Sequence, residues 1–213
     1  MPTKSFSLNI DHTIKSFKKT INVDSDKSLS IRSFLIGAIS QNISSVDNVL
    51  ESEDVYSTIN CLKRLNVKIK KNGPKSYLIY GKGLGSLYAK KNLKLNFGNS
   101  GTLARLLIGI MSTTPNIEVK IQGDHSLNKR NMKTLIELMS KFGADFHPKK
   151  KFNFSLKLIS TDLPLGLNYK AGGSAQIKSA VILAGLNSFG NTEIVEKEKS
   201  RDHTENMLIK NTQ

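Results

Sequence analysis

The fold is decided by residues 100–106, Ser100-Gly101-Thr102-Leu103-Ala104-Arg105-Leu106, where small residues precede an arginine that leads into an apolar run. Two further segments, residues 27–33 and 173–179, share this arrangement. Their cations are Arg32 and Lys178, and 73 residues separate each of them from Arg105. Three copies at one spacing indicate an internal repeat. We therefore predict three related units of about 73 residues each.

Each copy runs into an apolar helical stretch, and the sequence then predicts a strand, a second helix and a hairpin. In the first unit these are the extended segment 43–49, the helix 53–65 and the strands 67–70 and 77–80. In the second unit they are the strand 117–121, a single helix over 127–142 and a return strand over 152–158. In the third unit the strand 192–195 and a helix from residue 202 precede the end of the sequence, so we expect this unit to be incomplete.

Composition excludes several classes of protein. Apolar residues make up 38% of the 213 residues, which allows a buried core. No apolar run approaches the roughly 18 residues of a membrane-spanning helix, and residues 1–20 lack the apolar centre of a secretory signal. The single cysteine, Cys61, lies among apolar residues of a predicted helix, so we expect it in the core. We expect a soluble cytoplasmic protein with no membrane partner.

The net charge of +15 comes from 27 scattered Lys and only 5 Arg. Nucleic-acid binders usually combine an arginine-containing basic stripe with aromatic residues. Aromatic residues make up only 7% of this chain, so we expect no nucleic-acid partner. A basic nucleic-acid-binding protein stays open as the less favoured alternative.

The repeated segments predict an anion-binding site. Each copy places a small residue four positions before its cation, in the pairs Ser28 and Arg32, Gly101 and Arg105, and Ser174 and Lys178. Residues four apart share a helix face, and the first turn of a helix offers unpaired N–H groups to anions. Three such helix starts brought together would hold a small ligand with phosphate or carboxylate groups. The alternative is that Ser28, Ser100 and Ser174 only cap their helices and that the cations are solvated.

Two further polar clusters stay ambiguous at this level. Arg130 follows Lys129 near a predicted helix start, where it either binds an anion or faces solvent. Residues 200–205 combine a hydroxyl, Arg201, two acids and His203, which suits either a catalytic cluster or a well-capped helix. The histidines have no metal-ligand spacing, so we expect no metal site.

Five segments resemble motifs of the 5-enolpyruvylshikimate-3-phosphate synthase (3-phosphoshikimate 1-carboxyvinyltransferase) family. In chain order they are residues 26–34, 96–107, 123–132, 173–180 and 200–208. The resemblance implies a mixed α and β fold, one lobe of an enolpyruvyl transferase-like inside-out α/β barrel built from βαβαββ units. It implies units at about 21–92, 93–165 and 166–213, and a strand segment at 1–20 that would join a second lobe. Since family members have that second lobe, we expect the chain to be an N-terminal half.

The resemblance also implies a reaction. The complete enzyme would transfer the enolpyruvyl group of phosphoenolpyruvate to the 5-hydroxyl of shikimate 3-phosphate and release phosphate, in the shikimate pathway to chorismate and the aromatic amino acids. It would use no metal or organic cofactor and would be a monomer when full length. The residues implied to bind shikimate 3-phosphate are Lys27, Ser28, Arg32, Ser174, Ala175, Gln176 and Arg201. Those implied to bind phosphoenolpyruvate are Lys27, Gly101, Arg130 and Gln176.

The proton-transfer groups of this family are expected in the second lobe, so no catalytic residue is expected in this chain, which we expect to be inactive alone. The chain departs from the family pattern at Asp24 and Ser25, where Pro-Gly is usual, and at Asn131, where Pro is usual. Related enolpyruvyl transferases that act on a UDP-sugar use a cysteine on a mobile loop, which does not suit Cys61 on a predicted helix. A non-catalytic half-protein that binds shikimate 3-phosphate is the remaining alternative.

Overall fold

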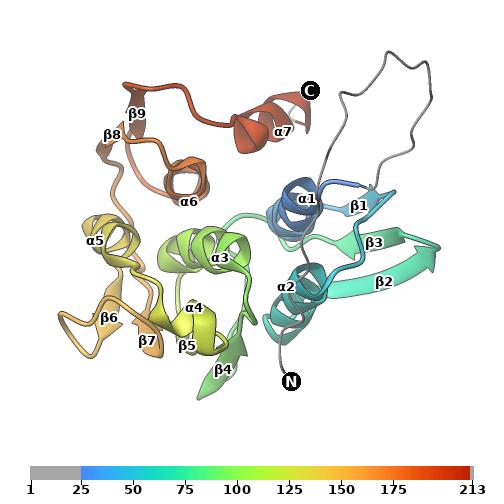
Figure 1. Ribbon diagram of the computed structural model, residues 1–213, viewed down its shortest axis with the longest axis horizontal. Helices are drawn as coiled ribbons and strands as arrows, with labels where there is room; N and C mark the ends of the chain where they lie inside the picture. Colours follow the sequence, from blue (N-terminus) through green and yellow to red (C-terminus); the bar gives the residue numbers. More distant parts are fainter. Residues whose placement is uncertain (1–24, 212–213) are drawn as a thin grey trace, which may run out of the picture.

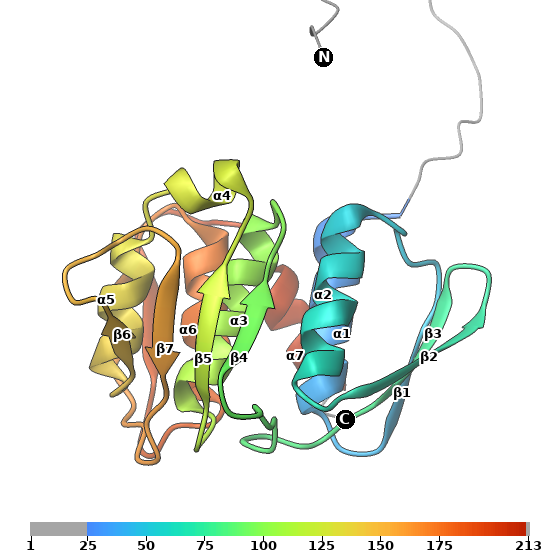
Figure 2. The same cartoon turned by 90° about the horizontal axis from the view of Figure 1, so that it is seen from below.

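The computed structural model describes residues 25–211, and the strand segment expected at residues 1–20 lies outside them. Three successive groups of elements follow one another along the chain (Figures 1 and 2). The first contains α1 (Lys27–Ile39), β1 (Ile43–Val46), α2 (Glu53–Arg64), β2 (Lys68–Gly73) and β3 (Ser76–Tyr80). The second contains β4 (Leu93–Asn96), α3 (Gly101–Thr113), β5 (Glu118–Gln122), α4 (His125–Lys129), α5 (Lys133–Lys141), β6 (Asp145–His147) and β7 (Leu156–Ile159). The third contains β8 (Asn168–Ala171), α6 (Ala175–Gly185), β9 (Glu193–Glu196) and α7 (His203–Asn211).

The three sheets share one pattern. The second group has the strand order β4-β5-β7-β6, with β4 and β5 parallel and the other neighbours antiparallel. The first sheet, β1-β3-β2, matches its antiparallel part. The third sheet, β8-β9, matches its parallel pair. The repeat in the sequence is therefore accompanied by a repeat in strand order.

Helices fill the interior and the sheets lie outside them. In Figure 1, α1, α3 and α6 lie at the middle of the molecule and the strands lie around its rim. Every residue of α3 except Arg105 is buried. A helix that is apolar on all sides is typical of the centre of a protein, whereas α2 buries only one face, formed by residues such as Val55, Ile59 and Leu62. The mixed α and β fold expected from the sequence is confirmed.

The α3 and α6 helices approach each other closely at Gly109. A Cβ atom at this position would lie 2.5 Å from the carbonyl oxygen of Ala180 and 3.0 Å from its Cα. Both of these atoms belong to the backbone of α6, which cannot move aside as a flexible side chain can. The lack of a side chain at Gly109 therefore sets how closely the two helices pack.

The prediction of a single helix over residues 127–142 is wrong. The chain forms α4 and α5 instead, because Arg130 adopts an extended conformation, with φ −68° and ψ 137°. The backbone N–H of Met132 donates to the carbonyl of Phe152, at 2.7 Å, and the Asn131 side chain accepts from the N–H of Lys133, at 2.8 Å. These hydrogen bonds replace the backbone i to i−4 hydrogen bonds that a continuous helix would form between α4 and α5.

The predicted return strand over residues 152–158 is too long. Strand β7 begins only at Leu156. Before this strand, the carbonyl of Phe152 accepts the hydrogen bond from the N–H of Met132. The buried Phe154 ring packs edge-on against Phe97, with 5.9 Å between the ring centroids. The alternating pattern at 152–155 therefore serves packing against other elements and not sheet pairing.

Other expectations of the sequence are confirmed. The helix at 53–65 and the hairpin that follows it appear within a few residues of their predicted bounds. Cys61 is buried, and its thiol lies 3.3 Å from the carbonyl oxygen of Asn96. Burial raises the pKa of this thiol to about 12, so it is neutral at physiological pH. Across residues 25–211, the helices lack the length and apolar character that crossing a bilayer would require.

The close packing at Gly109 can be tested with Gly109→Ala. Alanine favours a helix by about 1 kcal/mol relative to glycine, but overpacking against backbone costs typically about 1–3 kcal/mol. We expect a lower free energy of unfolding in urea for this variant. The matched control is Gly37→Ala in α1, where the nearest atom, at 3.0 Å, is the flexible end of Ile79. We expect this control to be neutral or stabilised, and equal effects of both substitutions would contradict the argument.

Candidate anion-binding site at the helix starts

The N-terminal ends of α1, α3 and α6 lie together. The side-chain amide of Gln176, on α6, accepts a hydrogen bond from Arg105 at 3.0 Å and donates one to Thr102 at 2.9 Å, both on α3. Arg32, on α1, donates to the hydroxyl of Ser179 on α6 at 3.1 Å. The structure therefore brings together the three helix starts that the repeat singled out.

Two of the three serines at these starts are caps. Ser100 accepts a hydrogen bond from the N–H of Leu103, and Ser174 accepts one from the N–H of Ile177. The first helix is capped by Asp26, whose carboxylate accepts from the N–H of Leu29 at 2.6 Å. The capping alternative is therefore confirmed for Ser100 and Ser174 and wrong for Ser28.

This choice of caps changes the direction of each cation. Arg32 lies six residues after its cap, Arg105 five and Lys178 four. Since each helical residue turns by about 100°, the three side chains leave their helices in different directions relative to the caps. The three equivalent cations also differ in the residues that surround them.

Two guanidinium groups converge on Gly101. A Cβ atom there would lie 2.7 Å from Nη1 of Arg130 and 2.8 Å from Nη1 of Arg105. Arg105 donates to the carbonyl of Gly101 and to Gln176, both at 3.0 Å, while Arg130 donates to the Asn99 side chain at 2.7 Å. Within the described residues neither arginine forms an ion pair with a carboxylate. Burial, and then the charge of Arg130, lowers the pKa of Arg105.

The surroundings of Gly101 therefore suit an anion. Two uncompensated guanidinium groups lie beside a helix start, where further backbone N–H groups point outward. Planar guanidinium groups bind phosphate and carboxylate with paired hydrogen bonds. Sequence reasoning placed Gly101, Arg105 and Arg130 in candidate anion-binding positions but left out Thr102 and Asn99, because the partners of these two, Gln176 and Arg130, lie on other elements.

Arg32 is only 4% exposed. Its Nε donates to Thr204 at 2.8 Å, and its Nη1 donates to the carbonyl of Ser28 at 3.1 Å. Burial, and then the neighbouring charge of Arg201, lowers the pKa of Arg32. Arg32 and Arg201 thus lie near each other, although Arg201 itself is exposed.

Lys178 is held by two carboxylates. It is 2% exposed, and its Nζ lies 2.9 Å from Glu196 and 2.5 Å from Glu205. Burial acts to lower the pKa of Lys178, but these carboxylates outweigh burial and raise it. The expectation that all three repeated cations face a ligand or solvent is therefore wrong for Lys178, which joins α6 to β9 and α7.

The remaining candidate residues surround these helix starts. Lys27 is half-exposed and forms an ion pair with Asp54 at 3.0 Å. Ser28 is partly buried, Ser174 is exposed, and Ala175 is buried at the first position of α6. Among the described residues, no group of three His, Cys, Asp or Glu side chains is arranged to hold a metal ion. The cations and helix starts gathered here suit an anion.

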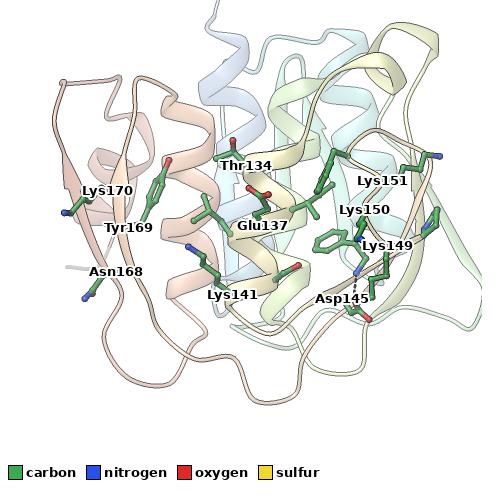
Figure 3. Close-up of a pocket in the computed structure, with 16 residues that line it drawn as sticks. Thr134, Glu137, Lys141, Asp145, Lys149, Lys150, Lys151, Asn168, Tyr169 and Lys170 are labelled. Atoms are coloured by element: carbon green, nitrogen blue, oxygen red, sulfur yellow. Dashed lines mark hydrogen bonds and ion pairs between the residues drawn. The ribbon is translucent and has the colours of Figure 1, made fainter.

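A separate hollow of about 670 Å³ lies between α5, the β6–β7 connection and β8 (Figure 3). Lysines at positions 141, 149, 150, 151 and 170 line it. Lys149 is already paired with Asp145, and the other lysines are spread along the groove. This hollow therefore lacks the convergence of cations found around Gly101.

Comparisons with known proteins agree with the resemblance in the sequence. The family described as EPSP synthase (3-phosphoshikimate 1-carboxyvinyltransferase) matches residues 12–211. Proteins named 3-phosphoshikimate 1-carboxyvinyltransferase are 39% identical over 92% of this chain in Bacillus velezensis and 38% identical over 87% in Paramagnetospirillum magneticum. A solved EPSP synthase from Acinetobacter baumannii is 35% identical, with a TM-score of 0.81 over 89% of this chain. The chain spans 45%, 42% and 42% of the lengths of these three proteins, respectively.

The arrangement around Gly101 predicts the effect of Gly101→Ala. A methyl group there would displace both guanidinium groups, so we expect the Kd for inorganic phosphate, measured by calorimetry, to rise about tenfold through loss of one charged hydrogen bond. The fold should be retained, because the displaced atoms are the ends of flexible side chains. Gly37→Ala, remote from the site, is the control, and an unchanged Kd for Gly101→Ala would show that neither arginine binds phosphate.

The Glu196 carboxylate predicts an acid-sensitive contribution to stability. The hydrogen bond from the Ser200 hydroxyl, and then the one from Lys178, lowers the pKa of Glu196 from 4.5 to about 2. This contribution should be fully present above pH 4.5 and should be lost as the pH falls towards about 2. Urea titrations at several pH values should therefore show that Glu196→Gln is less stable than the unmodified chain at pH 7 and that the difference shrinks in this window. A difference independent of pH would contradict the argument.

Proposed function

Since this chain belongs to the EPSP synthase (3-phosphoshikimate 1-carboxyvinyltransferase) family, we propose that it forms part of an enzyme that transfers the enolpyruvyl group of phosphoenolpyruvate to shikimate 3-phosphate. The observation that carries the proposal is the pair of guanidinium groups, Arg105 and Arg130, that meet at Gly101 without a carboxylate partner among the described residues. Both substrates are polyanions, and two guanidinium groups without a carboxylate partner attract negatively charged ligands.

In the proposed reaction, the 5-hydroxyl oxygen of shikimate 3-phosphate attacks C2 of phosphoenolpyruvate while C3 gains a proton. The 5-hydroxyl loses its proton in this addition. The tetrahedral intermediate then loses inorganic phosphate, as the C2–O bond to phosphate breaks, together with a proton from its C3 methyl group, which re-forms the C2–C3 double bond of the enol ether. This chain would bind and orient the reactants. The proton-transfer groups would come from the part of the relatives that the chain does not span, so we assign no catalytic residue here. The proposal includes no metal or organic cofactor.

We assign the phosphoenolpyruvate side to Gly101, Arg130, Lys27 and Gln176. An exposed Arg130 can grip a phosphate with two N–H groups. Gln176 already bonds to Arg105 and Thr102, which fixes its amide beside Gly101. The lack of a side chain at Gly101 allows a ligand to approach the backbone closely.

We assign the shikimate 3-phosphate side to Lys27, Ser28, Arg32, Ser174, Ala175, Gln176 and Arg201. The start of α6 supports this assignment. Within the described residues, the side chain of Ser174 accepts only from the N–H of Ile177, so the N–H groups of Ala175 and Gln176 lie outside the capping bond. Unpaired N–H groups at a helix start suit a phosphate. The charges of Arg32 and Arg201, which influence each other, add to the attraction.

The proposal can be tested with the chain itself. We expect shikimate 3-phosphate to shift amide NMR signals at residues 28–32, 174–178 and 200–202, and phosphoenolpyruvate to shift those at residues 99–101 and 128–130. Shikimate without its phosphate should leave the signals at 174–178 in place. The affinity for phosphoenolpyruvate should fall about tenfold in Arg130→Lys, since lysine keeps the charge but loses the planar fork. Absence of any shift with either compound would overturn the proposal.

Two alternative functions predict different results in binding and activity experiments. A non-catalytic half-protein would bind shikimate 3-phosphate but would release no phosphate from phosphoenolpyruvate. That release should be tested in a chimera in which residues 25–211 replace the matching part of the Bacillus subtilis relative, which is 38% identical. A nucleic-acid-binding protein would bind duplexes with a steep dependence on salt, and shikimate 3-phosphate would not compete. The proposal places the enzyme in the cytoplasm, as a monomer when full length, with small molecules and not nucleic acids or membranes as partners.

A further inference from the structure

The guanidinium of Arg32 is held by hydroxyl groups from two helices of the third group. Its Nε donates to Thr204 Oγ1, on α7, and its Nη2 donates to Ser179 Oγ, on α6. Thr204 and Ser179 are 0% and 1% exposed, so water does not compete for these bonds. A buried arginine gains its orientation from such partners and cannot readily rotate to follow a ligand.

The two hydroxyls are themselves fixed. Thr204 donates to Ser179 at 2.8 Å, and Ser179 donates to the carbonyl of Ala175 at 2.7 Å. Each hydroxyl has only one hydrogen to donate. With that hydrogen committed, the lone pairs of both oxygens are left to face Arg32 as acceptors.

The helix that carries Thr204 is fastened next to this residue. Glu205 forms a 2.5 Å ion pair with Lys178, and Lys178 directly precedes Ser179 in α6. Lys178 also pairs with Glu196 at the end of β9. The ion pairs therefore hold α7 and α6 together at the level of the two hydroxyls.

A guanidinium group has five N–H bonds. Three of those of Arg32 are used by Thr204, Ser179 and the carbonyl of Ser28, which leaves one N–H on Nη1 and one on Nη2 without a partner among the described residues. Two neighbouring N–H groups of this kind match the two oxygens of a carboxylate. These two N–H groups point at a carboxylate only if the guanidinium is held in one orientation.

We propose that Thr204 and Ser179 are positioning residues that orient Arg32 for a carboxylate ligand. The Lys178–Glu205 ion pair holds α7 in the position from which Thr204 reaches Arg32. The identity of the ligand rests on the proposed function, which assigns Arg32 to the side of shikimate 3-phosphate, a compound that carries a carboxylate. The orientation of Arg32 itself does not rest on that function. Through this network α7 takes part in substrate binding, although its Thr204 lies 172 residues from Arg32 in the sequence.

The test compares Thr204→Val with Thr204→Ser. Valine keeps the shape of threonine and removes the hydroxyl, whereas serine keeps the hydroxyl and removes a methyl group. We expect the Kd for shikimate 3-phosphate to rise about tenfold in Thr204→Val and to stay within about threefold in Thr204→Ser. The Arg32 Nε–H NMR signal should be protected from exchange in the unmodified chain and in Thr204→Ser, and should lose its protection in Thr204→Val.

Ser179→Ala, which removes the acceptor of Nη2, provides a second variant should Thr204→Val fail to fold, and the same rise in Kd is expected. If Arg32 only ties the helices together, these variants would lower stability in urea and leave the Kd of the folded protein unchanged, which would overturn the inference. If the unmodified chain does not bind shikimate 3-phosphate, the proposed function fails and the ligand assignment fails with it. The Nε–H signal then decides separately whether the hydroxyls orient Arg32, and a signal unaffected by Thr204→Val would overturn that part as well.

Discussion

The burial of α3 on all sides is the constraint on which the rest of this structure depends. A helix without a polar face must be covered by other elements in every direction, and α6 approaches it so closely that Gly109 has no room for a side chain. The single partly exposed residue of α3 is Arg105, close to its start. The helices α1 and α6, which pack against α3, begin at the same end as α3, where Arg105 lies. The candidate site follows from how the core is packed.

The three repeated cations illustrate how one sequence pattern can serve different purposes. Arg105 contributes charge beside Gly101, Arg32 is buried among hydroxyl groups, and Lys178 is neutralised by two carboxylates. The physical reason is that different elements pack against each cation. Arg105 lies beside Gln176 of α6, Arg32 beside Thr204 of α7, and Lys178 beside the carboxylates of β9 and α7. An internal repeat thus preserves the fold while its equivalent positions take on different roles.

The large hollow and the converging guanidinium groups lie at different places in the described part of the chain. The hollow beside α5 and β8 is large, but its lysines are spread along a groove and one is paired with Asp145. At Gly101, two guanidinium groups without a carboxylate partner among the described residues meet at one point. For a polyanionic ligand, convergent guanidinium groups at a helix start matter more than the volume of a cavity. This is why the proposed function rests on Arg105 and Arg130.

Residue type and spacing are enough to predict the repeat, the apolar helices, the amphipathic helix 53–65 and the candidate residues Gly101, Arg105 and Arg130, because both can be read along the chain. The sequence could not show that residues 127–142 break into two helices, since the break depends on a hydrogen bond from Met132 to Phe152. Nor could it show that Arg130 meets Arg105 at Gly101 or that Thr204 and Ser179 hold Arg32. Those contacts join residues that lie up to 172 positions apart, and only the packing of the helices brings them within hydrogen-bond distance.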